Sequence, residues 1–582
     1  MSKSTPKEAG KQLSLPGING SGSVRSKRKR RTSAPVFKPY RQDQMLLLPP
    51  SLEELIPPNH VVRVINETVE KLNIEPLLQT YKGGGTSSYH PLMLLKVLLY
   101  AYVERIYGSR KIAKALRENV HFMWLSGMQF PDFRTINNFR SGRLKGHIDT
   151  IFASLMLHLV KAGYVDLKDY FVDGSKFMAN ANRHSHVWKK NVTRYRESVR
   201  EAIKELLLQI DEVNEEENRR YGERDLPELG EGVDLDEESQ EAMVGEINEE
   251  MGKLQKKATG DVDSSPVPES ETIAHRVDEI EKRLAKAESS AAVEKKRQIV
   301  KKIKEKLLAR LQRYEEQERI LGRRGSYSKT DPDATFMRFK DGVLAPGYNI
   351  LMGSQHQFIL NYSVHQNPAD TACLIEHLQK LWRLYARLPE NVVGDSGFGS
   401  EENYGYLQNH GIGNYLKYNN FHNEEKRRKK HPYAKENFTR DAQEDVFICP
   451  EGRKLHFAEE EIKETASGYQ RRIRRYRSRS CQGCAARPQC CRGEGARGVE
   501  FSPLLEEFKR QARENLKSEK GKLLRRRRGV EIETIFAQLK FNRKYYRFLL
   551  RGLEKVNIEL GLLSISHNIE KMFRTQLQLK AA

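Results

Sequence analysis

Residues 331–420 constrain the fold most, because their apolar residues first alternate with period two and then change to helical spacing. The alternation covers DPDATFMRF and PGYNILMGSQHQFILNYSVH, and helical spacing follows in TACLIEHLQKLWRLYARL. A short strand in NVVGDSG, a helix in EENYGYLQNH and a strand in GNYLKY complete the stretch. The order strand, strand, helix, strand, helix, strand predicts an α/β fold, in which a sheet is packed against helices.

Two aspartates follow short apolar runs that we expect to be strands. Asp395 ends the strand 391–393 and precedes small residues, which let a phosphate or another chain come close. Asp173 follows the apolar run 170–172 and precedes Gly174 and polar, small residues, so we expect its carboxylate at an open strand end. The alternative for both aspartates is a turn, because Asp before Gly or Ser is a common turn sequence.

A third carboxylate lies on the helix predicted in RRRRGVEIETIFAQLK, residues 525–540. Glu533 and Lys540 are seven residues apart, which is two turns at about 100° per residue, so they share one face. Glu531 lies two residues from Glu533 and therefore points to the opposite side. The alternative is an amphipathic surface helix with solvated charges.

Three converging carboxylates point to divalent metal. Without a cation they repel one another and take up protons, whereas hard divalent cations prefer such oxygen ligands. If Asp173, Asp395 and Glu533 meet, we therefore expect them to hold two Mg²⁺ ions, or Mn²⁺ in their place.

The balance of charge points to a polyanionic partner. The 582 residues contain 101 Lys and Arg against 78 Asp and Glu, a formal net charge of +23. Such a surplus favours nucleic acid, and double-stranded DNA in particular. No run of about 18 uninterrupted apolar residues and no charged-then-apolar leader occurs. We therefore expect neither a membrane span nor a signal peptide, and a cytoplasmic, nucleoid-associated protein.

Residues 1–40 are expected to be a disordered basic tail, and residues 41–160 a helical DNA-binding domain. Within the second range, SRKIAKALREN, a break at Gly127 and PDFRTINNFRSGRL are similar to a helix-turn-helix, although any helical hairpin gives a similar pattern. The side chains that its second helix would offer to bases and phosphates are Arg134, Asn137, Asn138, Arg140 and Arg143.

Residues 191–330 form a charged helical insertion. Apolar residues recur there at three and four spacing, which predicts long helices packed as a hairpin. The strongly acidic stretch 211–250 is expected to be a flexible link.

Residues 421–500 form a basic, Cys-rich insertion. Cys449, Cys481, Cys484 and either Cys490 or Cys491 have the spacing of a tetrahedral Cys₄ zinc site, a possible structural Zn²⁺. The alternative is reduced thiols without metal. The interleaved arginines would present a rigid basic surface to DNA. Those assigned to DNA binding are Arg471, Arg474 and Arg477.

Taken together, these motifs resemble the DDE transposases of bacterial insertion sequences, in particular the IS-eleven-eighty-two type within the IS-four superfamily. The resemblance rests on FVDGSKFMANANRH, DPDATFMRFKDGVLAPGYNI, VVGDSGFGS and VEIETIFAQLKFNRKYYRFLLRGLEKV, and it covers most of residues 38–570. One departure concerns the superfamily's last signature, which has a tyrosine and an arginine ahead of the glutamate and lysine. The tyrosine is absent, and Gly529 stands where the arginine is usual, with Arg528 one residue further back.

The resemblance implies an RNase H-like catalytic core, a mixed sheet with flanking helices. Its parts would be residues 161–190, 331–420 and 501–575, followed by a tail at 576–582. In such a core the first and fourth strands lie side by side, so that Asp173 and Asp395 would occupy neighbouring strand ends, with Glu533 approaching from its helix.

The implied function is that of a transposase, acting as a homodimer on DNA. It would bind the ends of an insertion sequence, cleave DNA and join the 3′-hydroxyl ends to target DNA by two-metal phosphodiester transfer. Lys540 and Arg528 would hold phosphates. The alternatives are a DNA-binding regulator or inactive transposase-derived protein, and a purely hydrolytic DNA nuclease.

Overall fold

The computed structural model describes residues 51–81, 88–221, 269–287, 289–465, 467–491, 493 and 495–581. The predicted tail at 1–40 and most of the predicted acidic link at 211–250 lie outside the described residues. None of the described helices has the length and apolar character that crossing a membrane requires.

The N-terminal part of the chain is helical, as the sequence predicted. Helix α3 (Pro91–Val103) is at its centre, because the helix is apolar all round and buried on nearly every side. Its start is fixed by Pro91 in the first turn and by the His90 ring, which accepts a hydrogen bond from the Leu92 N–H. The break at Gly127 is a left-handed C-cap with φ of 58°. The other helices are α1 (Val61–Glu70), α2 (Glu75–Leu78), α4 (Ser109–Glu118), α5 (Val120–Ser126), α6 (Phe133–Asn138), the π-helical turn η1 (Phe139–Arg143) and α7 (Ile148–Lys161).

A mixed sheet follows, and its elements agree with the predicted alternation of strands and helices except in one place. The predicted second strand, residues 346–365, is two antiparallel strands, because the chain turns at His356 and Gln357, both of which have positive φ. The elements are β1 (Asp169–Met178), β4 (Thr335–Arg338), β5 (Leu344–Gln355), β6 (Phe358–His365), the turn η3 (Asp370–Ala372), α13 (Leu374–Tyr385), β7 (Asn391–Gly394), the turn η4 (Ser396–Phe398), α14 (Glu401–Asn409) and β8 (Gly413–Leu416). Strand β1 pairs with antiparallel β5 on one side and parallel β7 on the other, and β7 pairs with parallel β8. Strands β4 and β6 both pair with β5. The first strand of the sheet and the strand before Asp395 are therefore neighbours, as expected.

The last helices of the chain return to this sheet. They are α17 (Pro503–Lys517), α18 (Glu519–Arg528), the π-helical turn η7 (Gly529–Glu533), α19 (Thr534–Ala537), the π-helical turn η8 (Gln538–Asn542) and α20 (Leu553–Ala581). Helix α18 contacts β7, and η7 contacts both β1 and β5. The chain around Glu533 is thereby placed against the strands that carry the aspartates.

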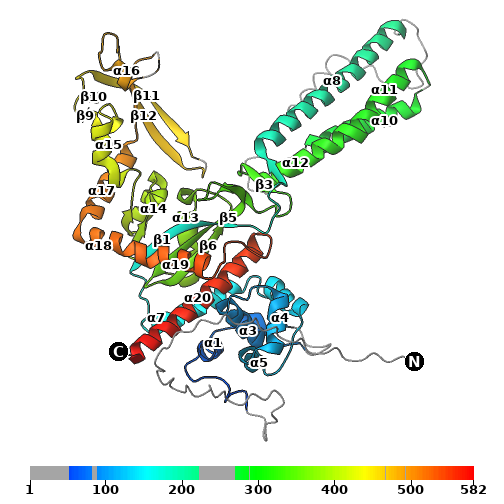
Figure 1. The fold of residues 1–582 in the computed structure, drawn as a ribbon. Helices are drawn as coiled ribbons and strands as arrows, with labels where there is room; N and C mark the ends of the chain where they lie inside the picture. The colour runs from blue at the N-terminus through cyan, green and yellow to red at the C-terminus, as the bar shows by residue number, and fades with distance from the viewer. Residues whose placement is uncertain are drawn as a thin grey trace, which may run out of the picture. The chain divides into compact units, whose positions relative to one another are not determined.

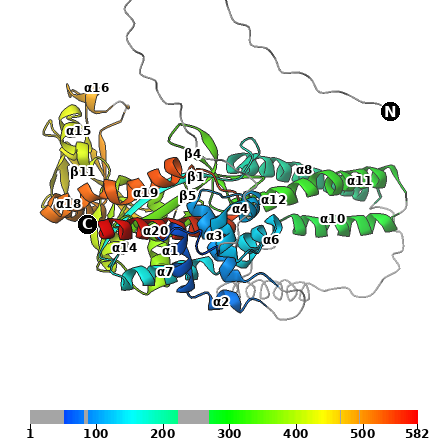
Figure 2. The same cartoon turned by 60° about the horizontal axis from the view of Figure 1, so that its bottom comes forward.

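Helix α20 joins the sheet to the N-terminal helices, since it packs on β6, α3 and α7 (Figures 1 and 2). Gly561 permits the close packing, because a Cβ there would lie 2.5 Å from the Tyr362 hydroxyl oxygen. The predicted tail from 576 continues α20 to Ala581.

Residues 189–321 contain long helices with an apolar core of their own. Helices α8 and α12 lie side by side (Figure 1), and Val199, Ile203, Leu307 and Leu311 belong to a buried cluster separate from that of the sheet. The helices are α8 (Lys189–Tyr221), α10 (Glu269–Lys286), α11 (Ala291–Lys302), the π-helical turn η2 (Ile303–Leu308) and α12 (Ala309–Leu321). At their base, β2 (His186–Trp188) pairs with β3 (Ser326–Ser328).

A second, antiparallel sheet lies in the Cys-rich part of the chain. Its strands, in chain order, are β9 (Thr439–Asp441), β10 (Val446–Ile448), β11 (Lys454–Glu464), β12 (Gln470–Ser478) and β13 (Gly498–Phe501), accompanied by helices α15 (Glu424–Lys430) and α16 (Arg487–Cys490). Sequence pattern does not predict this sheet, because β11 and β12 consist largely of charged residues, mostly Arg and Glu. Their apolar content is confined to a few buried side chains such as Leu455, Ile473 and Tyr476.

Candidate active site

The pairing of β1 with β7 places two carboxylates beside each other. The two strands pair in parallel up to Phe171 opposite Val393, and Asp173 and Asp395 follow two residues later on each strand. Asp395 caps the turn η4, and its Oδ1 accepts a hydrogen bond of 2.8 Å from the Gly397 N–H. The expectation that Asp173 ends its strand is wrong, because β1 continues to Met178 through its pairing with β5.

One guanidinium gathers the three predicted carboxylates. Arg528 Nη2 lies 3.2 Å from Asp173 Oδ1 and 3.8 Å from Asp395 Oδ2, and Arg528 Nη1 lies 2.8 Å from Glu533 Oε1. The side chains of Arg528 and Asp173 are 9% and 17% exposed, whereas those of Asp395 and Glu533 are 38% and 55% exposed, so the cluster extends from a buried guanidinium to the surface. The structure therefore brings together residues that are up to 360 positions apart in the sequence.

A π-helical turn puts Arg528 in reach of Glu533. The turn η7 spans Gly529–Glu533, and in a π-helix the hydrogen bonds run from residue i to residue i+5. Residues five apart thus return to the same face, which an ordinary α-helix would not allow. The displacement of the arginine by one position, noted in the sequence, is compensated by this wider turn.

Glu531 and Glu533 point in different directions. The Glu531 side chain is 9% exposed, and its Oε2 accepts a hydrogen bond of 3.0 Å from the Gln357 N–H while Oε1 accepts one from Arg527. The Glu533 side chain is 55% exposed and faces Arg528. Glu533 is therefore the glutamate on the side of the two aspartates.

Electrostatics at the site favour proton uptake by a carboxylate. Burial raises the pKa of Asp173 to about 6, and the nearby charges of Asp395 and Asp370 act in the same direction, against the opposing effect of Arg528. Burial also raises the pKa of Asp370, which the sequence analysis missed. The sequence offered only an Asp before a predicted helix, which is the ordinary pattern of a helix cap.

Lys540 reaches the strand that carries Asp173. Its Nζ donates hydrogen bonds of 2.7 Å to the Ser175 hydroxyl and to the Lys176 carbonyl, and it lies 4.5 Å from the centre of the Phe177 ring. Burial lowers the pKa of Lys540 to about 8. The ammonium is thus directed to β1, two residues beyond Asp173, and not to Glu533.

The residues predicted to read DNA differ in accessibility. Arg134, Asn138 and Arg143 are exposed and Asn137 is half-buried. The assignment of Arg140 to DNA binding is wrong. Its side chain is 3% exposed, donates a hydrogen bond of 2.7 Å to a main-chain carbonyl and lies 4.0 Å from a buried glutamate, so it is part of the core.

The arginines of the second sheet are largely paired with acids. Arg471 Nε lies 3.3 Å from Glu401 Oε2, and Arg474 Nη2 lies 2.9 Å from Asp445 Oδ2. Strand β11 places further glutamates opposite β12, whereas Arg477 is exposed opposite the uncharged Gly498. This hairpin is therefore less basic than the arginine run alone suggested.

The predicted zinc ligands line one small pocket together with Cys491, the fifth cysteine of this region. Main-chain N–H groups donate to two of the sulfur atoms, from Arg453 to Cys449 at 3.3 Å and from Arg497 to Cys481 at 3.4 Å. Burial raises the pKa of the Cys490 thiol. The structure thus gathers the cysteines, and zinc binding stays a prediction. The ligands in question are Cys449, Cys481, Cys484 and Cys490.

As the side chains stand, no three or more His, Cys, Asp or Glu residues within the described ranges form a ready-made metal site. At the candidate active site, the carboxylates are arranged around Arg528 instead.

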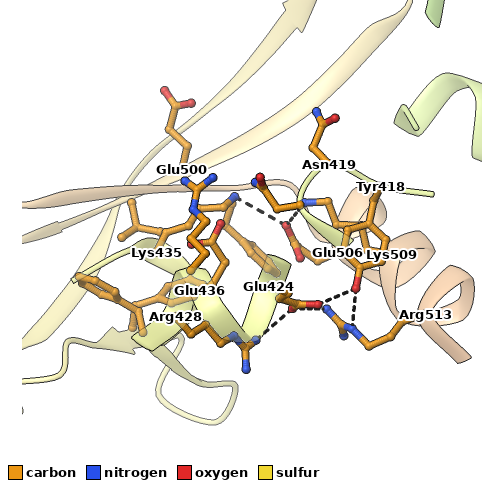
Figure 3. Close-up of a pocket in the computed structure, with 16 residues that line it drawn as sticks. Tyr418, Asn419, Glu424, Arg428, Lys435, Glu436, Glu500, Glu506, Lys509 and Arg513 are labelled. Atoms are coloured by element: carbon orange, nitrogen blue, oxygen red, sulfur yellow. Dashed lines mark hydrogen bonds and ion pairs between the residues drawn. The ribbon is translucent and has the colours of Figure 1, made fainter. Parts of the chain in front are cut away.

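A separate pocket lies between α15, α17 and the second sheet (Figure 3). Several of its charged side chains pair with one another: Arg513 donates to Glu424 at 2.8 Å and to the Tyr418 hydroxyl at 3.0 Å, and Lys509 pairs with Glu506 at 2.9 Å. The contact between Arg513 and Glu424 joins α17 to α15, whereas the buried Oε2 of Glu436 in the same lining has no hydrogen-bond partner among the described residues.

Comparison with known protein families gives two matches. Residues 448–573 match the family described as "Transposase DDE domain", and residues 50–142 match the family described as "Transposase domain (DUF772)". Arg528, Glu533 and Lys540 lie within the first match, and Arg134 lies within the second. No curated protein and no solved structure matches the chain.

Proposed function

We propose that this chain, which carries a transposase DDE domain and with it the activity of a polynucleotidyl transferase, moves an insertion sequence. It would bind the ends of the element, cleave the DNA there and join the 3′-hydroxyl ends to target DNA. The observation that carries the proposal is the convergence of Asp173, Asp395 and Glu533 on one buried guanidinium. Because the sequence motifs resemble those of the IS-eleven-eighty-two type, we propose that the element belongs to that type.

The residues present fit a divalent cation. DDE transposases use divalent metals, and the donors gathered here are carboxylate oxygens, the ligands that Mg²⁺ and Mn²⁺ prefer. Burial, with the nearby charges of Asp395 and Asp370, raises the pKa of Asp173, and a bound cation would favour its ionised form. Asp173, Asp395 and Glu533 would hold the metal ions. When bound, the ions supply activation of a water or a DNA 3′-hydroxyl and stabilisation of the leaving oxygen.

Basic side chains of the chain itself would position the DNA backbone. Arg528 is paired with the three carboxylates in this structure, and once the metal ions neutralise them its planar guanidinium would donate hydrogen bonds to a phosphate. Lys540 carries a point charge held beside Ser175 on β1. Both lie next to the carboxylates, so a phosphodiester bound by them would be oriented for in-line attack.

The N-terminal helices would supply the recognition of DNA. Arg134, Asn138 and Arg143 lie on their exposed surface, and the net charge of +23 favours a polyanion. Because joining requires that two element ends be held together, we propose that two copies of the chain act as a homodimer on DNA, at the nucleoid.

The experiment is incubation of the purified chain with Mg²⁺ and a DNA that carries the element's ends. We expect nicked ends first and joined products later. Asp173→Asn, Asp395→Asn and Glu533→Gln should each abolish both while DNA binding is retained. Glu531→Gln is the matched control, because Glu531 lies on the same helix and faces away from the aspartates.

Two outcomes would count against the proposal. If nicked ends form but joined products do not, at any Mg²⁺ concentration, the protein is a hydrolytic DNA nuclease. If the protein binds the ends but cleaves no DNA, it is a DNA-binding regulator.

A further inference from the structure

A fourth carboxylate, that of Asp370, lies at the candidate active site. Asp370 opens the turn η3, and η3 contacts η4, the turn that follows Asp395. Asn403 joins the two turns, because its buried Nδ2 donates hydrogen bonds to the Thr371 carbonyl at 2.9 Å and to the Phe398 carbonyl at 2.8 Å. Asp370 is thereby fixed in place beside Asp395.

Two glycines leave the room that the Asp370 carboxylate occupies. A Cβ at Gly174, the residue after Asp173, would lie 2.7 Å from Asp370 Cγ, so any side chain there would force the Asp370 carboxylate to move. A Cβ at Gly397 would lie 3.0 Å from Asp395 Oδ1 and 3.4 Å from Asp370 Oδ2. Gly174 and Gly397, which follow Asp173 and Asp395 in the motifs DGS and DSG, therefore both border the Asp370 carboxylate.

The Asp370 carboxylate has a hydrogen-bond donor, and the charge of Lys176 acts on it without an ion pair between the two in the described part of the chain. Its Oδ1 accepts a hydrogen bond of 2.7 Å from Asn349 Nδ2, and Asn349 is 1% exposed on β5. In the part of the chain that the structure describes, no cationic side chain forms an ion pair with Asp370, whereas Arg528 pairs with the other carboxylates. Two neighbouring carboxylates without a cation between them are unfavourable, and a divalent ion supplies the missing charge.

We propose that Asp370 is a ligand of the divalent cation at this site, sharing it with Asp173 and Asp395. The inference rests on the proposed function, which places a divalent cation among these carboxylates. Arg528 and the cation would then compensate different parts of one cluster of four acids.

Binding of Mn²⁺ to the purified full-length chain, without DNA, tests this role. Free Mn²⁺ is measured by electron paramagnetic resonance during a titration. Asp370→Asn and Asp173→Asn should each weaken the affinity by about tenfold or more. Glu531→Gln removes a buried carboxylate outside the cluster and should leave the affinity unchanged. Asn at 370 still accepts the hydrogen bond from Asn349, and thermal unfolding followed by circular dichroism verifies that the variant is folded.

The outcomes separate this inference from the proposed function. Unchanged affinity in Asp370→Asn, together with loss in Asp173→Asn, would overturn the role of Asp370 and leave the proposed function standing. Unchanged affinity in both variants would overturn both.

Gly174→Ala gives a second, independent measurement. Its methyl group should displace the Asp370 carboxylate and weaken Mn²⁺ binding to the same extent, but it should cause no further loss when Asp370→Ala has already removed that carboxylate. A further loss in that background would contradict the packing argument.

Discussion

Cation binding by this protein should depend on pH in a definite direction, because the environment of Asp173 raises the pKa of its carboxyl group. Burial is the main cause that raises the pKa of Asp173 from 3.8 to about 6. A shift of about two units corresponds to about 3 kcal/mol against the ionised form in the folded chain. Well below pH 4 the carboxyl is protonated in both folded and unfolded chains, and well above pH 6 it is ionised in both. The metal-free protein therefore loses about 3 kcal/mol of stability as the pH rises from about 4 to above 6.

A cation needs the ionised carboxylate and must compete with this proton. At pH 6 about half of the Asp173 side chains are protonated, so binding should release at least about half a proton per chain from this group. At pH 8 the release should be close to zero. Between pH 8 and pH 5 the apparent affinity should fall about tenfold for the same reason. Isothermal titration calorimetry with Mn²⁺, in pairs of buffers that differ in ionisation enthalpy, measures both quantities.

Arg528 provides the matched perturbation. Its guanidinium lowers the pKa of Asp173, so Arg528→Gln should move the midpoint of the pH dependence above 6. Proton release that is absent at pH 6 in the wild-type chain, or a midpoint that moves down in Arg528→Gln, would refute the reasoning.

Three further predictions concern other parts of the chain. Arg140→Ala should lower the free energy of unfolding, measured in urea, by about 3 to 5 kcal/mol, because buried Glu559 loses its partner. Arg134 is exposed, so Arg134→Ala should leave stability unchanged and should reduce the slope of log binding constant against log salt concentration by about one. Equal unfolding curves for the two variants would contradict this. The purified chain should carry about one Zn²⁺, lost in Cys484→Ser, and elemental analysis that finds no zinc, with the thiols freely titratable, would exclude the Cys₄ site. The rate of DNA cleavage should decline as the pH rises through about 8, where Lys540 loses its charge. Lys540→Arg should remove that decline, because a guanidinium stays charged. An unchanged pH profile in Lys540→Arg would show that Lys540 does not hold the phosphate.

The sequence alone predicted part of the local structure and three of the four acids that meet at the candidate site. Apolar periodicity predicted the alternation of strands and helices from β4 to β8, except that it did not separate β5 from β6, because period-two spacing shows which face of a strand is buried and does not show where the chain turns back. The rotation per residue along a helix selected Glu533 over Glu531, and the structure has them facing different partners. That Asp173 and Asp395 lie on neighbouring strands came from the family resemblance, because no local pattern encodes which strands pair.

The tertiary structure decided what depends on distant parts of the chain. The length of β1 beyond Asp173 is set by pairing with β5, and the burial of Arg140 by packing against α20. The arginines of β12 face glutamates of β11 through a register that their own pattern does not reveal.

Two features of the candidate site itself also needed the fold. The π-helical turn that aligns Arg528 with Glu533 adds a residue to one turn, and helical periodicity read at a constant angle cannot anticipate it. Asp370 lies far from the other acids in sequence and looks like a helix cap, and only the packing of η3 against η4 places it beside Asp395. Local spacing fixes which way a side chain points on its own element, whereas convergence of charges is a property of contacts between elements, which the folded chain alone establishes.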